Sequence, residues 1–313
     1  MRILVYGAGA VGSALGGFLE LAGHEVGLLG RPAHMEAVAR DGLTISGILG
    51  DFRARPGVVD NPVEFDPELV IITVKSFDTK TAARELAPLG NGKRRFLGLQ
   101  NGIGNGEILA ESLPPETVFS GMIIIGFVVP APGHVKITVY GGDMQVGRIG
   151  RPRDREIDEL ARVFQDIPIK VHAADHIESH LWSKLLYNAS LNPLGAILGV
   201  NYGRLTEPAV LGMIRALLTE AFAIIRARSI PVPWSGADEY FEHLVNVQIP
   251  ATSEHRPSML ADLEAGRRTE IDFINGAICR LGREIGHPTP VNETLTAQIK
   301  FLEQRALNRR QNT

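Results

Sequence analysis

The segment VYGAGAVGSALGGFL, residues 5–19, holds three glycines in the spacing Gly-x-Gly-x-x-Gly. It follows the apolar run RILVY and opens a predicted helix, which is the setting of a strand-turn-helix unit. In such a unit the first glycine permits a tight turn, the second lets the backbone approach a pyrophosphate, and the third lets the helix pack closely on the strand. The amides at the helix N-terminus then face the anion. We therefore expect a dinucleotide to bind this loop through Gly7, Gly9, Ala10, Val11 and Gly12.

The rest of the first half alternates short apolar runs with helical patterns, which is typical of a parallel α/β sheet. A later pair of runs, residues 134–142 and 144–150, predicts an antiparallel hairpin around Gly141 and Gly142 at an edge of the sheet. The other expected strands are residues 24–30, 69–75, 94–100 and 117–126.

From about Asp175 the pattern is almost entirely helical, and residues 211–228 are a clear amphipathic example. The sequence therefore predicts an α/β fold in which an N-terminal Rossmann-type dinucleotide-binding domain, residues 1–174, precedes an all-helical domain, residues 175–313. The amphipathic helices of the second domain could pair across a homodimer or pack within one subunit.

Composition limits the classes of partner. Of the 313 residues, 44% are hydrophobic and 21% are charged, and the formal net charge is −3, so no bulk charge favours nucleic acid or an anionic membrane. A single cysteine, Cys279, excludes an internal disulfide framework. We see no signal peptide and no apolar run near the roughly 18 to 20 residues of a membrane span. We therefore expect a cytoplasmic protein with a small-molecule ligand.

The end of the second expected strand favours NADP over NAD. An NAD-binding unit would place an acidic residue there for the ribose 2′-hydroxyl, whereas this chain has Gly30 and Arg31. A guanidinium can bind a 2′-phosphate with two charge-assisted hydrogen bonds. Lys75 ends the third strand at the same edge and could add a phosphate contact. Asn101, in the turn after the fourth strand, could reach the nicotinamide ribose or the substrate, or could simply form the turn.

The segment LWSKLLYNASLNPLGA, residues 181–196, carries an amine and two amides on one face of an otherwise apolar helix, because Lys184, Asn188 and Asn192 recur every fourth residue. A desolvated amine has a lowered pKa and can donate a proton near neutral pH. The amides could bind hydroxyl or carbonyl groups of a substrate. The alternative is that the lysine stem covers apolar surface and the amides cap nearby backbone.

Two further polar residues lie downstream. Glu270 could position Lys184 or bind a substrate hydroxyl, and Ser258 could donate to a carboxylate; a surface ion pair and a helix N-cap are the respective alternatives. The histidines at 172, 176 and 180 have a spacing that can bind zinc on one helix face, but His172 precedes the expected helix start. We expect no metal site.

These motifs together resemble the ketopantoate reductases (2-dehydropantoate 2-reductases). The resemblance rests on the glycine loop and on TVKS, QNG, LWSKLLYNASLNPL, PSML and GRRTEIDFINGA, which occur in the family's order over nearly the whole chain. It implies NADPH-dependent reduction of 2-dehydropantoate to (R)-pantoate in pantothenate biosynthesis. It also implies a site between a Rossmann domain and a helical domain.

By the same resemblance, Lys184 would be the general acid on the carbonyl oxygen, with Glu270 beside it. The phosphate of NADPH would be bound by Arg31 and Lys75. Asn101 would lie where cofactor and substrate meet, and the substrate would be held by Asn188, Asn192 and Ser258.

One position departs from the family, which often has asparagine three residues before the serine, where this chain has His255. That difference bears on the choice of substrate more than on the reaction, so a related branched 2-oxo acid is an alternative. A non-catalytic NADP(H)-binding sensor would explain Arg31 but would leave the Lys184 face without a role. An oxidising hydroxy-acid dehydrogenase would use the same residues in reverse.

Overall fold

The computed structural model describes residues 1–311, which form two compact units. The first unit holds Met1–Gln100 and Gly104–Ile177, and the second holds Asn101–Ile103 together with the chain from Glu178 onward. The short segment Asn101–Ile103 therefore belongs to the helical unit although strands of the first unit precede and follow it.

The first unit is built on an eight-stranded sheet in the order β12-β11-β8-β7-β6-β1-β2-β5. The six strands from β8 to β5 are parallel, whereas β11 runs antiparallel to β8. The expected α/β class and the strands expected within residues 24–30, 69–75 and 94–100 are confirmed, whereas the run 117–126 is divided between β8 and the start of a strand, residues 125–131, of another sheet. The strands are β1 (Arg2–Tyr6), β2 (Glu25–Leu29), β5 (Gly57–Val58), β6 (Leu69–Ile72), β7 (Arg95–Gly98), β8 (Val118–Met122), β11 (Met144–Gly147) and β12 (Val171–Ala173).

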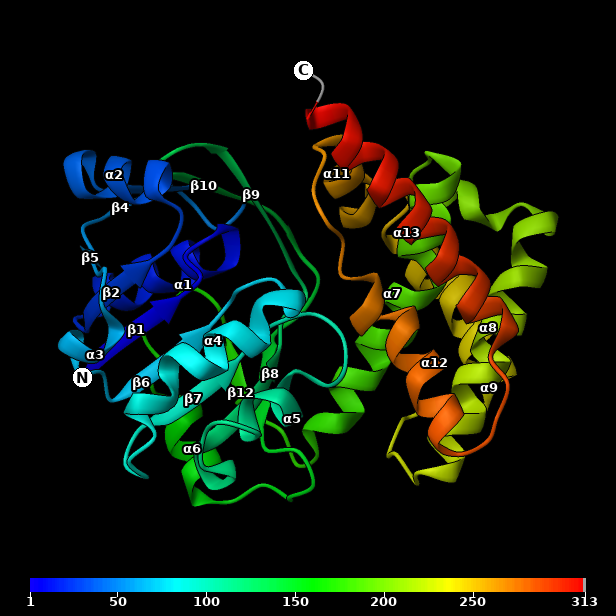
Figure 1. The fold of residues 1–313 in the computed structure, drawn as a ribbon, viewed down its shortest axis with the longest axis horizontal. Helices are drawn as coiled ribbons and strands as arrows, with labels where there is room; N and C mark the ends of the chain where they lie inside the picture. The colour runs from blue at the N-terminus through cyan, green and yellow to red at the C-terminus, as the bar shows by residue number, and fades with distance from the viewer. Residues whose placement is uncertain (312–313) are drawn as a thin grey trace. The chain divides into compact units, whose positions relative to one another are not determined.

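Helices cover both faces of this sheet. Side chains on both faces of the central strands are therefore buried, which is why these strands are continuously apolar in sequence. Alternate residues of β1 face opposite layers: Ile3 and Val5 pack in one core with α1, and Leu4 packs in another with α4. Figure 1 shows α4 lying across β6 and β7. The helices of this unit are α1 (Ala10–Leu21), α2 (Pro32–Asp41), α3 (Pro62–Phe65), α4 (Thr79–Leu86), α5 (Asn105–Ala110) and α6 (Arg155–Arg162).

A second sheet of four strands, in the order β4-β3-β10-β9, was not foreseen, and the predicted hairpin around Gly141 and Gly142 is wrong. The strand β10 pairs with β9 and β3 in this second sheet, whereas β11 pairs with β8 and β12 in the first. The link at Gly141 therefore carries the chain between sheets, because the tight turn at Gly133, with φ +76°, already pairs β10 with the preceding strand. The four strands are β3 (Leu43–Gly47), β4 (Phe52–Ala54), β9 (Ile125–Ala131) and β10 (His134–Tyr140).

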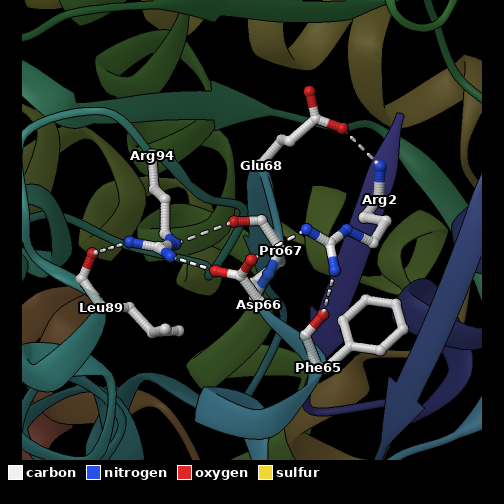
Figure 2. Close-up of polar contacts among 7 residues, drawn as sticks. All are labelled: Arg2, Phe65, Asp66, Pro67, Glu68, Leu89 and Arg94. Carbon is white, nitrogen blue, oxygen red and sulfur yellow. Dashed lines mark hydrogen bonds and ion pairs between the residues drawn. The ribbon is translucent and has the colours of Figure 1, made fainter.

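Ion pairs and hydrogen bonds tie together the N-terminal ends of the central parallel strands (Figure 2). The Asp66 carboxylate, just before β6, accepts from Arg2 at 2.8 Å and also from Arg94. The Arg94 guanidinium donates in addition to the carbonyls of Pro67 and Leu89, at 3.0 and 3.3 Å. The two arginines hold the pKa of Asp66 below its usual value. This network fixes the end of the sheet opposite the glycine loop.

The second unit is helical, and its helices pack around one core. The long helix α7 (Ile177–Leu198) carries the predicted lysine and asparagine face and contains Pro193. The remaining helices are α8 (Pro208–Ala227), α9 (Ala237–His243), α10 (Ile249–Ala251), α11 (Ser258–Glu264), α12 (Asn275–Glu284) and α13 (Pro290–Gln311).

The expectation that no apolar run approaches the length of a membrane span was wrong for α8. By length and composition alone this helix is long and apolar enough to cross a membrane. Its Leu217, Leu218 and Phe222 are buried in the core of the helical unit. Its buried Glu220 accepts the backbone amides of Val291 and Asn292 at the start of α13. The apolar character of α8 therefore comes from its place in the core.

Candidate functional site

The glycine loop connects β1 to α1 and turns sharply against the end of the neighbouring strand β6. Gly7 has φ +101°, and a Cβ there would lie 2.6 Å from the Val74 nitrogen. The amides of Gly7 and Ala8 both donate to the Leu29 carbonyl, at 2.9 and 2.8 Å. Only glycine fits this combination of left-handed backbone and close approach.

The other two glycines of the motif have different surroundings. A Cβ on Gly12 would lie 2.8 Å from Val5 Cγ1, so this glycine allows α1 to pack on β1. A Cβ on Gly9 would meet nothing closer than the Gly7 carbonyl oxygen at 3.9 Å. The space beside Gly9 is thus open at the N-terminus of α1, where the first helical amides have no partner within the helix. The loop fits a pyrophosphate cradle, with Ala10 and Val11 opening the helix.

The two basic residues expected to bind phosphate lie at the same edge of the sheet. Arg31 follows β2 and caps α2, where its carbonyl accepts the amides of His34 and Met35, both at 3.1 Å. Its exposed guanidinium forms no hydrogen bond or ion pair with another described residue. Lys75 follows β6 and precedes the short helix Ser76–Asp78. Because β2 and β6 flank β1 in parallel, the glycine loop, Arg31 and Lys75 all come from adjacent strand ends.

In the helical unit, three of the predicted residues form one hydrogen-bonded chain. Lys184 Nζ donates to Asn101 Oδ1 at 2.7 Å, and Asn101 Nδ2 donates to Glu270 Oε2 at 3.0 Å. The amide therefore presents its oxygen to the ammonium and its nitrogen to the carboxylate, and this fixes its orientation. Glu270 is only 7% exposed, so the alternative of a surface ion pair does not describe it.

The environment of Lys184 changes its acidity. Burial lowers its pKa from 10.5 to about 8, and the negative charge of Glu270 works in the opposite direction. Desolvation disfavours the charged amine, whereas a nearby carboxylate favours it. The balance leaves a lysine that is mostly protonated at pH 7 and is a far stronger acid than an exposed lysine.

The two asparagines further along α7 are placed differently. Asn192 is buried, and its Nδ2 donates to Ser258 Oγ at 3.0 Å while its Oδ1 accepts the Met259 amide at 3.0 Å. Its side chain thus holds the exposed Ser258 at the start of α11. Asn188 is half-buried and makes no side-chain hydrogen bond to another described residue. The substrate-binding roles of Asn188, Asn192 and Ser258 stay predictions.

The comparisons with known proteins agree along nearly the whole chain. Sequence profiles described as "Ketopantoate reductase PanE/ApbA" and "Ketopantoate reductase PanE/ApbA C terminal" match residues 3–151 and 176–303. A 2-dehydropantoate 2-reductase of Aquifex aeolicus is 37% identical over 97% of each chain, and one of Archaeoglobus fulgidus is 34% identical over 96% of this chain and 98% of its own. The chain belongs to the ketopantoate reductase family.

Solved structures extend this result. The ketopantoate reductase of Ralstonia eutropha JMP134 has a TM-score of 0.87 and 30% identity, over 98% of this chain and 99% of its own. A ternary complex of D-mandelate dehydrogenase with NADH and anilino(oxo)acetate has a TM-score of 0.88 and 27% identity over the same shares. The family's fold, and its class as an oxidoreductase, therefore apply to this chain.

His255, the residue that stands where the family often has asparagine, is part of an aromatic cluster. The His255 ring lies 5.1 Å from the ring of Tyr202, which packs edge-on against Tyr187 at 5.6 Å. Tyr187 donates to Thr252 Oγ1 at 2.8 Å. Burial lowers the pKa of His255. Sequence reasoning missed Tyr187 and Tyr202, although Tyr187 stands three residues after Lys184 on α7.

The three histidines considered as a zinc site lie on different elements. His172 is in β12, where its Nε2 is 2.8 Å from the Asp143 carboxylate, His176 precedes α7, and His180 is within α7. The one-face arrangement behind the zinc alternative is therefore wrong. Among the described residues, no group of three or more histidine, cysteine or acidic side chains could hold a metal ion.

The unequal surroundings of the glycines give a prediction. Gly9→Ala places a methyl group in open space, so the free energy of unfolding should change by less than about 1 kcal/mol, while the affinity for the nicotinamide dinucleotide falls at least about tenfold. Gly12→Val, which overpacks α1 against β1, should instead lose about 3 kcal/mol of stability. Urea unfolding and fluorescence titration with NADPH measure the two effects. A Gly9→Ala protein that binds NADPH as tightly as the wild type would contradict the assignment of this loop.

Proposed function

We propose that the protein reduces 2-dehydropantoate to (R)-pantoate with NADPH, in the biosynthesis of pantothenate, and that Lys184 is its general acid. The observation that carries the proposal is the series of hydrogen bonds from Lys184 through Asn101 to Glu270. In this series the amide of Asn101 holds a desolvated ammonium, and the Glu270 carboxylate favours its charged form. The curated relatives support 2-dehydropantoate as the substrate.

A nicotinamide dinucleotide fits the first unit. The open backbone beside Gly9 suits a pyrophosphate, and the solved D-mandelate dehydrogenase binds NADH. The choice of NADPH rests on this chain's own charges, because Arg31 and Lys75 follow the strands on either side of β1 and no carboxylate follows β2 to repel a 2′-phosphate. When bound, the reduced nicotinamide supplies a hydride to the carbonyl carbon.

The protein's own residues handle the proton. As the carbonyl carbon is reduced, its oxygen gains negative charge, and a neighbouring ammonium both stabilises this charge and donates a proton to it. Asn101 accepts one N–H of Lys184 and so fixes the position of the ammonium from which the proton is donated. Lys184 Nζ loses the proton that the new hydroxyl gains, and it recovers one from water. Glu270 keeps the amine largely protonated between turnovers because its charge raises the pKa of Lys184.

The remaining predicted ligands would hold the substrate's other groups. Ser258 is presented by Asn192 and can donate to a carboxylate, while Asn188, one turn after Lys184, can bind a hydroxyl. We place this activity in the cytoplasm, with a small 2-oxo acid as the partner and no role for nucleic acid or a membrane. The mass of the protein in solution, measured by light scattering, distinguishes a homodimer from a monomer.

A second candidate substrate class follows from His255. Its ring lies beside Tyr202 in an aromatic cluster, and D-mandelate dehydrogenase, named for an aromatic hydroxy acid, shares the fold of the chain. Aromatic or bulkier branched 2-oxo acids could pack against such a cluster better than against an asparagine.

A substrate panel tests the proposal. We expect the purified protein to oxidise NADPH fastest with 2-dehydropantoate, and more slowly with phenylglyoxylate, with other branched 2-oxo acids or with NADH. Absorbance at the nicotinamide band measures the rate. A higher kcat/KM for phenylglyoxylate would move the assignment to the second substrate class. Tight NADPH binding without turnover of any acid would contradict the enzymatic reading and favour the redox sensor.

The lowered pKa of Lys184 sets the pH dependence. The acid form exists below the pKa, so kcat/KM for reduction should be level below neutrality and fall about tenfold per pH unit above about pH 8. Glu270→Gln removes the charge that raises this pKa, so the falling limb should move to lower pH. An unchanged limb in Glu270→Gln, or a wild-type limb near the ordinary lysine value, would contradict the assignment of Lys184.

A further inference from the structure

A buried carboxylate on the last helix contacts the backbone next to Glu270. Glu303 lies on α13 and is only 8% exposed. Its Oε1 accepts two hydrogen bonds from Thr269, at 2.6 Å from the backbone nitrogen and at 2.5 Å from Oγ1. Thr269 itself is buried. Hydrogen bonds to a carboxylate are stronger than those between neutral groups, so this contact holds the backbone firmly.

The contact continues along the segment that carries Glu270. Thr269 Oγ1 accepts the Ile271 amide at 3.3 Å, and the Glu270 carbonyl accepts the Phe273 amide at 3.0 Å. The residues on both sides of Glu270 are therefore fixed, and the short helix Ile271–Phe273 begins at a defined place.

The far end of this segment fixes the loop that carries Asn101. The Phe273 carbonyl accepts the Ile103 amide at 2.9 Å. Gly102 has φ +84°, and a Cβ there would lie 2.6 Å from the Phe273 carbonyl carbon, so the two backbones touch. One short segment, residues 269–273, thus positions both Asn101 and Glu270, the two residues that are hydrogen-bonded in series to Lys184.

We propose that Glu303 is a positioning residue of the reductase site, which holds residues 269–273 and through them the Glu270 carboxylate and the Asn101 amide against Lys184. The inference rests on the proposed function, in which Lys184 is the general acid. A buried carboxylate is a costly way to join a helix to a loop, since an apolar side chain could pack there without a desolvation penalty. The carboxylate also fixes the orientation of Thr269, because the backbone nitrogen and Oγ1 of that residue both donate to the same oxygen.

The decisive variants are Glu303→Ala, which loses both hydrogen bonds, and Glu303→Gln, which keeps an acceptor oxygen but removes the charge. Gln304→Ala, at the next and exposed position of α13, is the matched control. Thr269→Val leaves α13 unaltered and removes the hydroxyl, which bonds to Glu303 and to the Ile271 amide, while the backbone bond from residue 269 to Glu303 remains. All variants are made in the full chain and checked by thermal melting.

The main readout is the acidity of Lys184, measured without turnover by competitive acetylation at a series of pH values with mass spectrometry of the Lys184 peptide. Displacing Glu270 removes the charge that favours the ammonium. Glu303→Ala should therefore lower the pKa of Lys184 by about half a unit or more. Thr269→Val should lower it by a smaller amount, since one of the two bonds to Glu303 remains, while Glu303→Gln and Gln304→Ala should stay near the wild type. In turnover, Glu303→Ala should lower kcat about tenfold with the KM for NADPH unchanged.

Two results would overturn the inference. If the pKa of Lys184 shifts equally in Glu303→Gln and Glu303→Ala, the charge of Glu303 acts on Lys184 at a distance. The placement of residues 269–273 by Glu303 would then have no part in the effect. If the pKa of Lys184 does not shift in Thr269→Val, the contact between Glu303 and Thr269 only joins α13 to the loop. The same variant tests the inference if Glu303→Ala does not fold. A wild-type protein that turns over no 2-oxo acid would defeat the proposed function, whereas the labelling would still report on Glu303.

Discussion

The hydrogen bond between the Lys184 ammonium and the Asn101 amide is the interaction on which the rest of the site depends. Burial of an amine is unfavourable, and without compensation the group would lose its proton near neutrality. Here the amide oxygen lies 2.7 Å from Nζ, and the amide nitrogen is tied to Glu270. Asn101 thus connects a cation and an anion, and the pKa of Lys184 is lowered by burial to about 8.

Each unit holds its own group of predicted site residues. In the first unit, Asp66 and Arg94 fix the N-terminal ends of the parallel strands, while the opposite ends carry the glycine loop, Arg31 and Lys75. In the second unit, three segments far apart in the sequence meet at one chain of polar side chains. Each of those segments is held by backbone hydrogen bonds, so the polar side chains keep one arrangement.

Much of this could be predicted from local sequence. The glycine spacing predicted the tight turn between β1 and α1, and the period of four residues placed Lys184, Asn188 and Asn192 on one helix, α7. The second sheet could not be foreseen in the same way, because β10 pairs with β3 some ninety residues earlier (His134 opposite Thr44), and no local pattern records that partner. The predicted hairpin failed for the same reason. Asn192 holding Ser258, and Glu303 holding Thr269, are likewise contacts that only the packing of the helices creates.

The most direct test of the account is Lys184→Ala, measured as NADPH-dependent turnover of 2-dehydropantoate beside a fluorescence titration with NADPH, with the exposed Lys93→Ala as control. If Lys184 donates the proton, kcat should fall by about 10²–10⁴-fold, while the Kd for NADPH changes less than about threefold. A Lys184→Ala protein with turnover close to the wild type, or one that has lost NADPH binding instead, would contradict the assignment of Lys184 as the general acid.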